Sequence, residues 1–191
     1  MAGRPELVRD GAVLTGGSAR GAKLFTIAGL DVRPALARMR NSLFQILAPR
    51  LGGPVLDLFA GIGTMGLEAL SRGAEFTVFV DSDPRCAAAV RRNVEKLRFT
   101  DRAEVVEDDA LRAPSFAAGR TFDLVFVDPP YALHADPAFA PKLEAAVAAL
   151  TVQGVIVVEH RTLQRFPDEW GTGKLIDRRI YGGTTASLYE R

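Results

Sequence analysis

The sequence contains a single cysteine, Cys86, which excludes an internal disulfide framework and a cysteine-based metal cluster. Its longest apolar runs are only as long as a strand, so none of them could cross a bilayer, and the N-terminus lacks a signal-peptide pattern. Internal repeats and low-complexity segments are also missing. These absences exclude disulfide-stapled secreted scaffolds and membrane proteins. We therefore expect a cytoplasmic protein with no membrane association and no metal site.

The net charge is only +1, so the chain as a whole carries no strong excess of either sign. The charge is unevenly distributed, however, because residues 1–50 hold eight Lys or Arg against three Asp or Glu. This part therefore carries +5, and the remaining 141 residues carry −4. A basic segment on an acidic body favours a polyanionic partner that the N-terminal part contacts.

From about residue 55 onward, short apolar runs alternate with helical patterns, which is typical of βαβ units and a parallel sheet. Helices are predicted near residues 64–72, 84–97 and 139–150, with a weaker one at 110–116. The crossover rule places such helices on both faces of the sheet. Five successive strands are predicted, at residues 54–59, 75–81, 103–107, 122–128 and 154–160.

Both ends of the chain depart from this alternation. Two β-like runs at 174–182 and 184–191 predict a closing antiparallel hairpin, which makes the expected sheet mostly parallel with seven strands. Near the start, residues 12–17 and 23–29 predict a small hairpin, and residues 33–51 predict one amphipathic helix whose first turn contains Pro34. We expect two units, an N-terminal extension at 1–50 and an α/β domain at 51–191.

A glycine-rich segment, "DLFAGIGTMG" at 57–66, joins the first predicted strand to the first helix. Gly61, Gly63 and Gly66 form the G-x-G-x-x-G pattern of dinucleotide-binding loops, which leaves a nicotinamide enzyme open. Asp57 argues against that interpretation, because a carboxylate beside the loop would repel a pyrophosphate. A positively charged ligand would instead be attracted by this carboxylate. S-adenosylmethionine has no phosphate and carries a sulfonium and an ammonium group, so it suits an acidic site.

Three acids then follow the first three predicted strands, at the edge where open α/β sheets bind ligands. Asp57 is expected to face the methionine end of the cofactor, and Asp81 to accept both ribose hydroxyls. Asp109 is placed to receive the adenine amino group, with the Ala110 N–H toward the ring. Phe59 either lines the methionine pocket or belongs to the core.

The apolar run "FDLVFV" ends in the tetrapeptide Asp128, Pro129, Pro130, Tyr131. The prolines cannot donate to a sheet and fix their own φ, so the chain leaves the strand as a stiff turn. Asp128 and the Pro129 carbonyl are placed to accept hydrogen bonds from the exocyclic amine of a base and to orient its lone pair. Tyr131 is expected to stack on that base. A plain strand-terminating turn is the alternative.

These motifs resemble those of class I S-adenosylmethionine-dependent methyltransferases. The segments "VLDLFAGIGTMGLEALSRGA", "VFVDSD", "EDDA" and "FVDPPY" are most similar to the RsmD family of 16S rRNA (guanine-N2)-methyltransferases, as are "GGSARGAKL", "VRPALARMRNSLFQIL" and "YGGTTASLYER". The resemblance implies a Rossmann-like sheet, S-adenosylmethionine as cofactor, and methylation of one guanine amino group in the small ribosomal subunit. We expect a monomer whose RNA contacts are made by Arg20, Lys23, Arg33, Arg38 and Arg40.

Three other functions remain open at this point. An adenine-N6 methyltransferase acting on RNA or DNA would use the same tetrapeptide, and a non-catalytic RNA-binding or assembly factor could keep the fold. A nicotinamide oxidoreductase is disfavoured by Asp57. The sequence also departs from the family pattern, because Ala22 and Ala35 stand where the family usually has a basic residue and a threonine. These two departures affect the expected RNA contacts and not the predicted catalytic residues.

Overall fold

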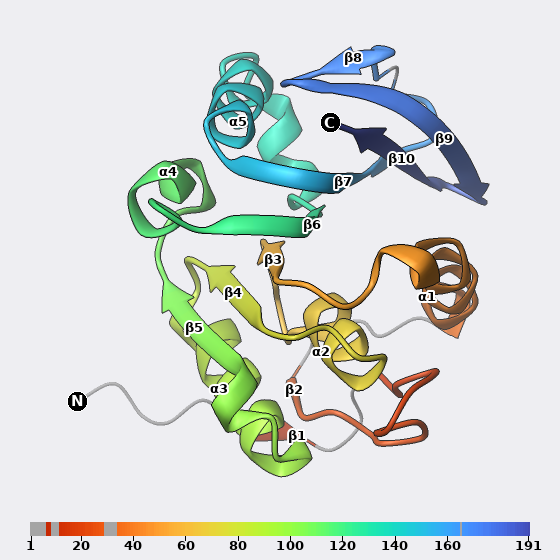
Figure 1. Ribbon diagram of the computed structural model, residues 1–191, viewed down its shortest axis with the longest axis vertical. Helices are drawn as coiled ribbons and strands as arrows, with labels where there is room; N and C mark the ends of the chain where they lie inside the picture. Colours follow the sequence, from red (N-terminus) through yellow and green to blue (C-terminus); the bar gives the residue numbers. More distant parts are fainter. Residues whose placement is uncertain (1–6, 9–11, 29–33, 165) are drawn as a thin grey trace.

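The computed structural model describes residues 7–8, 12–28, 34–164 and 166–191, without the side chains of 34–36 and 134–135. Its centre is an eight-stranded sheet with the order β5-β4-β3-β6-β7-β10-β9-β8 (Figure 1). The first five of these strands are parallel. They are β5 (Ala103–Glu107), β4 (Thr77–Asp81), β3 (Val55–Leu58), β6 (Thr121–Val127) and β7 (Thr151–Arg161).

The parallel strands consist mainly of apolar residues on both sides, because helices cover both faces of the sheet. One face carries α1 (Pro34–Leu47), α2 (Thr64–Ser71) and α3 (Pro84–Leu97). The other carries the short α4 (Ala113–Phe116), which follows the 3-10 turn η3 (Ala110–Arg112), and α5 (Phe139–Ala148). Three further 3-10 turns are η1 (Ala48–Arg50), η2 (Thr100–Arg102) and η4 (Tyr131–Ala135).

The C-terminal hairpin consists of β9 (Gly173–Tyr181) and β10 (Thr184–Glu190). The predicted antiparallel hairpin is confirmed, and its strand β10 lies between β7 and β9 and is antiparallel to both. The sheet has eight strands and not the predicted seven, because β8 (Glu169–Trp170) pairs with the start of β9. Two residues are too short to produce a recognisable periodicity, so sequence patterns could not reveal this strand.

The N-terminal hairpin packs on the face that carries α2 and α3. Leu14 and Leu24 donate backbone hydrogen bonds across it to Ala22 and Ala12, and a separate pair of short strands, β1 (Leu7–Val8) and β2 (Thr26–Ile27), closes it. Leu14 and Leu24 are fully buried against residues of α2 and α3. The described part of residues 1–50 therefore shares its core with the larger unit, and the boundary at residue 50 stays a prediction.

Candidate active site

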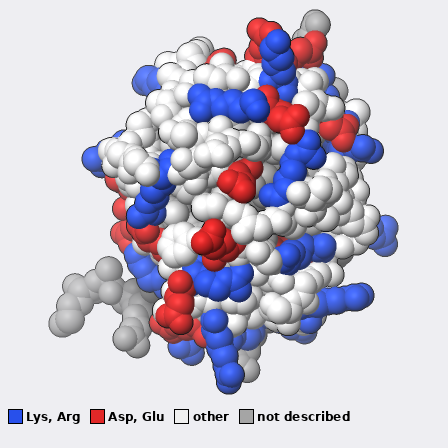
Figure 2. All heavy atoms as spheres, viewed as in Figure 1, with Lys and Arg blue, Asp and Glu red and all other residues white. Residues whose placement is uncertain are grey.

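The sheet order places a topological switch point between β3 and β6. From β3 the chain winds outward to β4 and β5 on one side, and it then returns to β6 and β7 on the other. Ligands of open α/β sheets bind beyond the carboxyl ends of the strands at such a point. In the view of Figure 1 the ends of β3 and β6 lie near the middle of the molecule, and Figure 2 shows acidic side chains there with lysine and arginine side chains around them.

The loop after β3 has an unusual backbone. Phe59, Gly61 and Gly63 all have positive φ, of 61°, 56° and 82°. For a phenylalanine this left-handed conformation is strained, and such strain concentrates at functional sites. A Cβ added at Gly61 would meet no protein atom within 4 Å, so the space above this glycine is open to an approaching ligand. The ring of Phe59 packs edge-on against Phe139 at 6.2 Å, which places it next to the core.

Asp81, at the end of β4, is fixed to this loop. Its Oδ2 accepts a hydrogen bond from the Gly61 N–H at 2.7 Å, and its Oδ1 accepts one from the Asp83 N–H at 2.9 Å. Each carboxylate oxygen keeps a further lone pair, so two hydroxyl donors can still bind side by side. Burial raises the pKa of Asp81, whereas these two hydrogen bonds oppose the shift. The carboxylate is thus held in place as a bidentate acceptor.

Asp57 lies at the end of β3 and is 2% exposed. Its Oδ2 accepts a hydrogen bond from the N–H of Gly66 in the first turn of α2, at 2.8 Å. Burial raises the pKa of Asp57 to about 7, and the nearby carboxylates of Asp128 and Asp81 add to that shift. Asp57 therefore fixes the glycine loop to its helix, and a cationic ligand beside it would favour its charged form.

Asp109 is exposed and caps the 3-10 turn η3, because its Oδ1 accepts a hydrogen bond from the Leu111 N–H at 2.9 Å. Ala110 is buried beneath it. Capping engages one oxygen of Asp109 and leaves the second for a ligand, so its assignment to an adenine amino group stays a prediction.

The tetrapeptide 128–131 follows β6 at the switch point. Asp128 is reachable from solvent, yet the surrounding protein displaces enough water to raise its pKa to about 6. Pro129 is buried, Pro130 is exposed, and Tyr131 begins the 3-10 turn η4. The carboxylate and the aromatic residue therefore both follow β6, three positions apart in the chain.

Two residues that the sequence analysis had not singled out hold Tyr131. The Tyr131 hydroxyl lies 3.1 Å from the Thr184 Oγ1 of β10, and the Arg161 guanidinium lies over the ring at 4.7 Å from its centroid. The hydroxyl contact and the cation–π contact fix the orientation of the ring and cover one of its faces. The "GGTT" segment at 182–185, which leads into β10 and contains Thr184, was the sequence signal for this residue, and the pairing of β10 with β7 brings it here.

The predicted RNA-contact residues fall into three groups. Arg20, Lys23 and Arg38 are exposed, whereas Arg33 lies outside the described residues. Arg40 differs from the expectation, because it is 3% exposed and its guanidinium bonds to Glu68 and to the Val13 carbonyl. Periodicity alone could not identify this buried arginine, since its partner lies on another helix. We therefore remove Arg40 from the set of RNA contacts.

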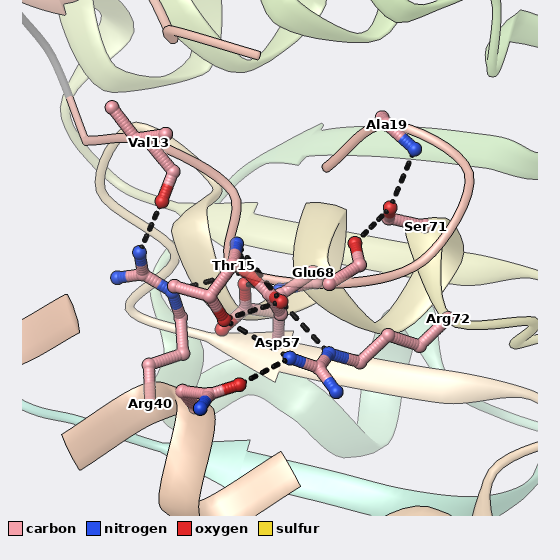
Figure 3. Close-up of polar contacts among 11 residues, drawn as sticks. Val13, Thr15, Ala19, Arg40, Asp57, Glu68, Ser71 and Arg72 are labelled. Atoms are coloured by element: carbon pink, nitrogen blue, oxygen red, sulfur yellow. Dashed lines mark hydrogen bonds and ion pairs between the residues drawn. The ribbon is translucent and has the colours of Figure 1, made fainter. Parts of the chain in front are cut away.

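Glu68, in the middle of α2, is fully buried and was also missed by the sequence analysis. It accepts hydrogen bonds from the Thr15 N–H at 2.8 Å and from the guanidinium groups of Arg40 at 3.2 Å and Arg72 at 2.8 Å (Figure 3). Arg72 reaches on to Asn41 of α1 at 3.0 Å. This network joins the N-terminal hairpin, α1 and α2.

The glycine-rich turn of the hairpin is fitted to the last turn of α2. The Ser71 hydroxyl donates to the Gly16 carbonyl at 2.6 Å and accepts from the Ala19 N–H at 2.9 Å. Gly17 has φ +74°, and a Cβ there would lie 1.8 Å from the Ser71 carbonyl oxygen. Glycine is required at this position by both conformation and contact, and the turn carries the exposed Arg20 at a fixed place.

None of the helices among the described residues is long and apolar enough to cross a membrane. In the same part of the chain, no group of three or more His, Cys, Asp or Glu side chains is arranged to hold a metal ion.

Comparison with known proteins places the chain in a family. A family model described as "Conserved hypothetical protein 95" matches residues 13–190. The Bacillus subtilis (strain 168) protein YlbH, named as a candidate rRNA methyltransferase, is 36% identical over 178 residues, or 92% of this chain and 96% of that protein. The ribosomal RNA small subunit methyltransferase D of Escherichia coli (strain K12) is 38% identical over 121 residues, or 62% of this chain and 59% of its own length.

A solved structure shows the same fold. The Escherichia coli protein yhhF, titled as a candidate methyltransferase, superposes with a TM-score of 0.79 at 31% identity over 94% of this chain and 97% of its own. Together with the family match and the site at the switch point, this shows that the chain belongs to the RsmD-type family of class I methyltransferases.

Proposed function

We propose that this protein transfers a methyl group from S-adenosylmethionine to the exocyclic N2 amine of a guanine in small-subunit rRNA. The observation that carries the proposal is the position of Asp128–Tyr131 at the end of β6, directly beside the glycine loop of β3. A methyl donor over the loop and an amine at Asp128 would be neighbours. The relative named for the small-subunit rRNA reaction, at 38% identity, supports the RNA substrate.

The residues at β3 and β4 suit S-adenosylmethionine better than a dinucleotide. Asp81 offers two oriented oxygens to a ribose diol, the open space above Gly61 admits a close ligand, and Asp57 adds negative charge. When bound, the cofactor supplies an electrophilic methyl group on a positively charged sulfur. Asp57, Asp81 and Asp109 would hold it, with Ala110 beside the adenine and Phe59 under the loop.

The residues after β6 supply orientation for the acceptor. The guanine N2 lone pair is delocalised into the ring, so the amine is a poor nucleophile until its N–H groups are held. The Asp128 carboxylate and the Pro129 carbonyl would accept those N–H groups, and the ring of Tyr131 would stack on the base through its uncovered face. As the N–C bond forms, positive charge develops on N2, and Asp128 stabilises it and can take the released proton.

A comparison of modified nucleosides tests the proposal. Small-subunit rRNA from a deletion strain and from its parent would be digested and analysed by mass spectrometry. We expect the deletion strain to lack a single N2-methylguanosine, and complementation to restore it. Loss of an N6-methyladenosine would instead support the adenine reaction, and an unchanged profile in both strains would reject methylation of this rRNA.

Replacing Asp81 with alanine is expected to weaken binding of S-adenosylmethionine by about 10- to 100-fold, because two charge-assisted hydrogen bonds to the ribose are lost. Isothermal titration calorimetry measures the effect. Asp101, in the exposed turn η2, provides a matched control, and Asp101→Ala should bind like the wild type. If Asp81→Ala keeps the wild-type melting temperature and the wild-type affinity, or if the wild type binds NAD instead, the cofactor assignment is wrong.

We also propose that the N-terminal part supplies contacts to RNA phosphates. Replacing Arg20, Lys23 and Arg38 together with alanine should weaken binding to small subunits and reduce the log–log salt slope by about one unit per lost contact. Affinity for the cofactor should not change, because these side chains are exposed and distant in sequence from the glycine loop. Filter binding at several salt concentrations measures the slope, and an unaltered slope would contradict the assignment.

A further inference from the structure

Glu159 is a buried acid that the reaction described so far does not use. It lies near the end of β7 and is 7% exposed. Within the part of the chain that the structure describes, it forms no hydrogen bond or ion pair, whereas the other buried acids Asp57 and Glu68 both have donors. Its carboxyl oxygens are not fully enclosed, so a ligand that supplies donors can reach them and offset the cost of this burial.

The sheet places Glu159 beside Asp128. Val127, the last residue of β6, pairs with Val158 of β7, so Asp128, which directly follows β6, comes level with Glu159. Adjacent strands lie about 5 Å apart, and residues at the same level of a sheet point to the same face. The electrostatic influence of Asp128 and Asp57 on Glu159 agrees with this placement. The carboxyl of Asp128, directly after β6, and that of Glu159, near the end of β7, are thus neighbours. Asp128 is the nearer of the two to β3 and β4.

The charge around this pair is not balanced by protein. Arg40 is the cation that acts on Glu159, yet its guanidinium is already engaged by Glu68 and the Val13 carbonyl. Burial, followed by the charges of Asp128 and Asp57, raises the pKa of Glu159 well above its ordinary value, and Arg40 opposes this shift. A ligand with adjacent N–H donors would relieve the repulsion and favour the charged form.

We propose that Glu159 accepts the N1–H of the target guanine while Asp128 accepts the N2 amine, so that Glu159 makes the site specific for guanine. The proposal rests on the proposed function. Guanine carries N1–H and N2–H donors next to each other on its Watson–Crick edge, which two neighbouring carboxylates match. Adenine has an acceptor at N1, which only the protonated form of Glu159 could match, so the charged form selects guanine. The strand order agrees, since β4 and β3 carry the residues that would hold the cofactor, β6 leads to Asp128, and β7 carries Glu159.

The test compares two nucleosides on protein saturated with S-adenosylhomocysteine. Guanosine has both donors, whereas 2-aminopurine riboside keeps the 2-amino group and has no N1–H. Ligand-observed NMR titration should show that the wild type prefers guanosine by about 10- to 100-fold. In Glu159→Ala the affinity for guanosine should fall to within about threefold of that for 2-aminopurine riboside, whose own binding should stay the same or improve because its N1 lone pair no longer faces a carboxylate.

Two further variants keep the test decisive. Glu159→Gln preserves the volume and one acceptor oxygen, so it should retain part of the preference and serves if the alanine variant does not fold. Glu169→Ala removes an exposed acid of β8 and should behave like the wild type. The preference of the wild type should also increase as pH rises, because only the charged carboxylate accepts N1–H well, and both Glu159 variants should lose this dependence.

The proposal is overturned if the wild type does not prefer guanosine, or if both Glu159 variants keep the full preference and its pH dependence. The rRNA comparison described above decides the guanine-N2 reaction separately. If N2-methylguanosine is lost there while Glu159→Ala still discriminates, only the role of Glu159 fails. If that comparison shows no guanine methylation that depends on this protein, the proposed function is itself wrong.

Discussion

Asp128→Ala is expected to slow methyl transfer by about three powers of ten, equivalent to roughly 4 kcal/mol of barrier. The variant loses the carboxylate that would orient the amine and stabilise its developing positive charge. Asp128 is reachable from solvent and makes no hydrogen bond to other described residues, so its removal should leave the fold unchanged. Single-turnover rates on purified small subunits, with saturating S-adenosylmethionine, measure the chemical step.

Two controls separate this effect from damage to the site. Asp128→Asn keeps the size and one acceptor oxygen and should lose less than the alanine variant. Calorimetry should show that the alanine variant still binds S-adenosylmethionine. An Asp128→Ala enzyme that binds both substrates and transfers methyl within about threefold of the wild-type rate would show that residues 128–131 form only a turn.

The wild-type rate should also depend on pH in a defined direction. The surroundings raise the pKa of Asp128 to about 6, so the carboxyl is protonated below that pH. In this form it can no longer accept the hydrogen bond from the amine as a carboxylate or take up the released proton. The single-turnover rate should therefore fall as the pH decreases through about 6. Because Glu159 and Asp57 lie nearby, the apparent pKa belongs to the group of acids and not to Asp128 alone.

Glu68→Ala is expected to lower the free energy of unfolding by about 3–5 kcal/mol, because it leaves the buried guanidinium of Arg40 without its counterion. Urea denaturation measures this change. The exposed pair Arg92–Glu95, 3.9 Å apart on α3, is the matched control, and Glu95→Ala should cost less than about 1 kcal/mol. Equal effects of the two substitutions would show that the network on α2 contributes no more than a surface ion pair.

The stabilisation by Glu68 should have a pH window. Burial would raise the pKa of this acid, but hydrogen bonds from Thr15 and Arg72 and the charge of Arg40 outweigh burial and hold the pKa below 4.5. A carboxyl whose pKa is lower in the folded state stabilises the protein above its unfolded pKa. This contribution is lost as the pH falls through the folded value, so the difference between wild type and Glu68→Ala should shrink in acid.

The local patterns were sufficient to predict most of the fold. Apolar runs and helical periodicity located the five parallel strands and the crossover helices to within a few residues, because both signals depend on neighbours in the chain. The same holds for the loop that contains Gly61 and Gly63 and for the stiff turn at Asp128. Each of these features follows from residue type and spacing, which a sequence states directly.

The sequence by itself therefore determined the α/β class, the glycine loop, the acids at the strand ends and the family. Only the tertiary structure decided which charged residues are buried and with whom. Arg40 is expected from its helical pattern to face solvent, yet it meets Glu68, 28 residues away on another helix. Glu159 lies beside Asp128 only because β7 follows β6 in the sheet. Burial and pairing between distant segments arise from packing, and local patterns carry no record of them.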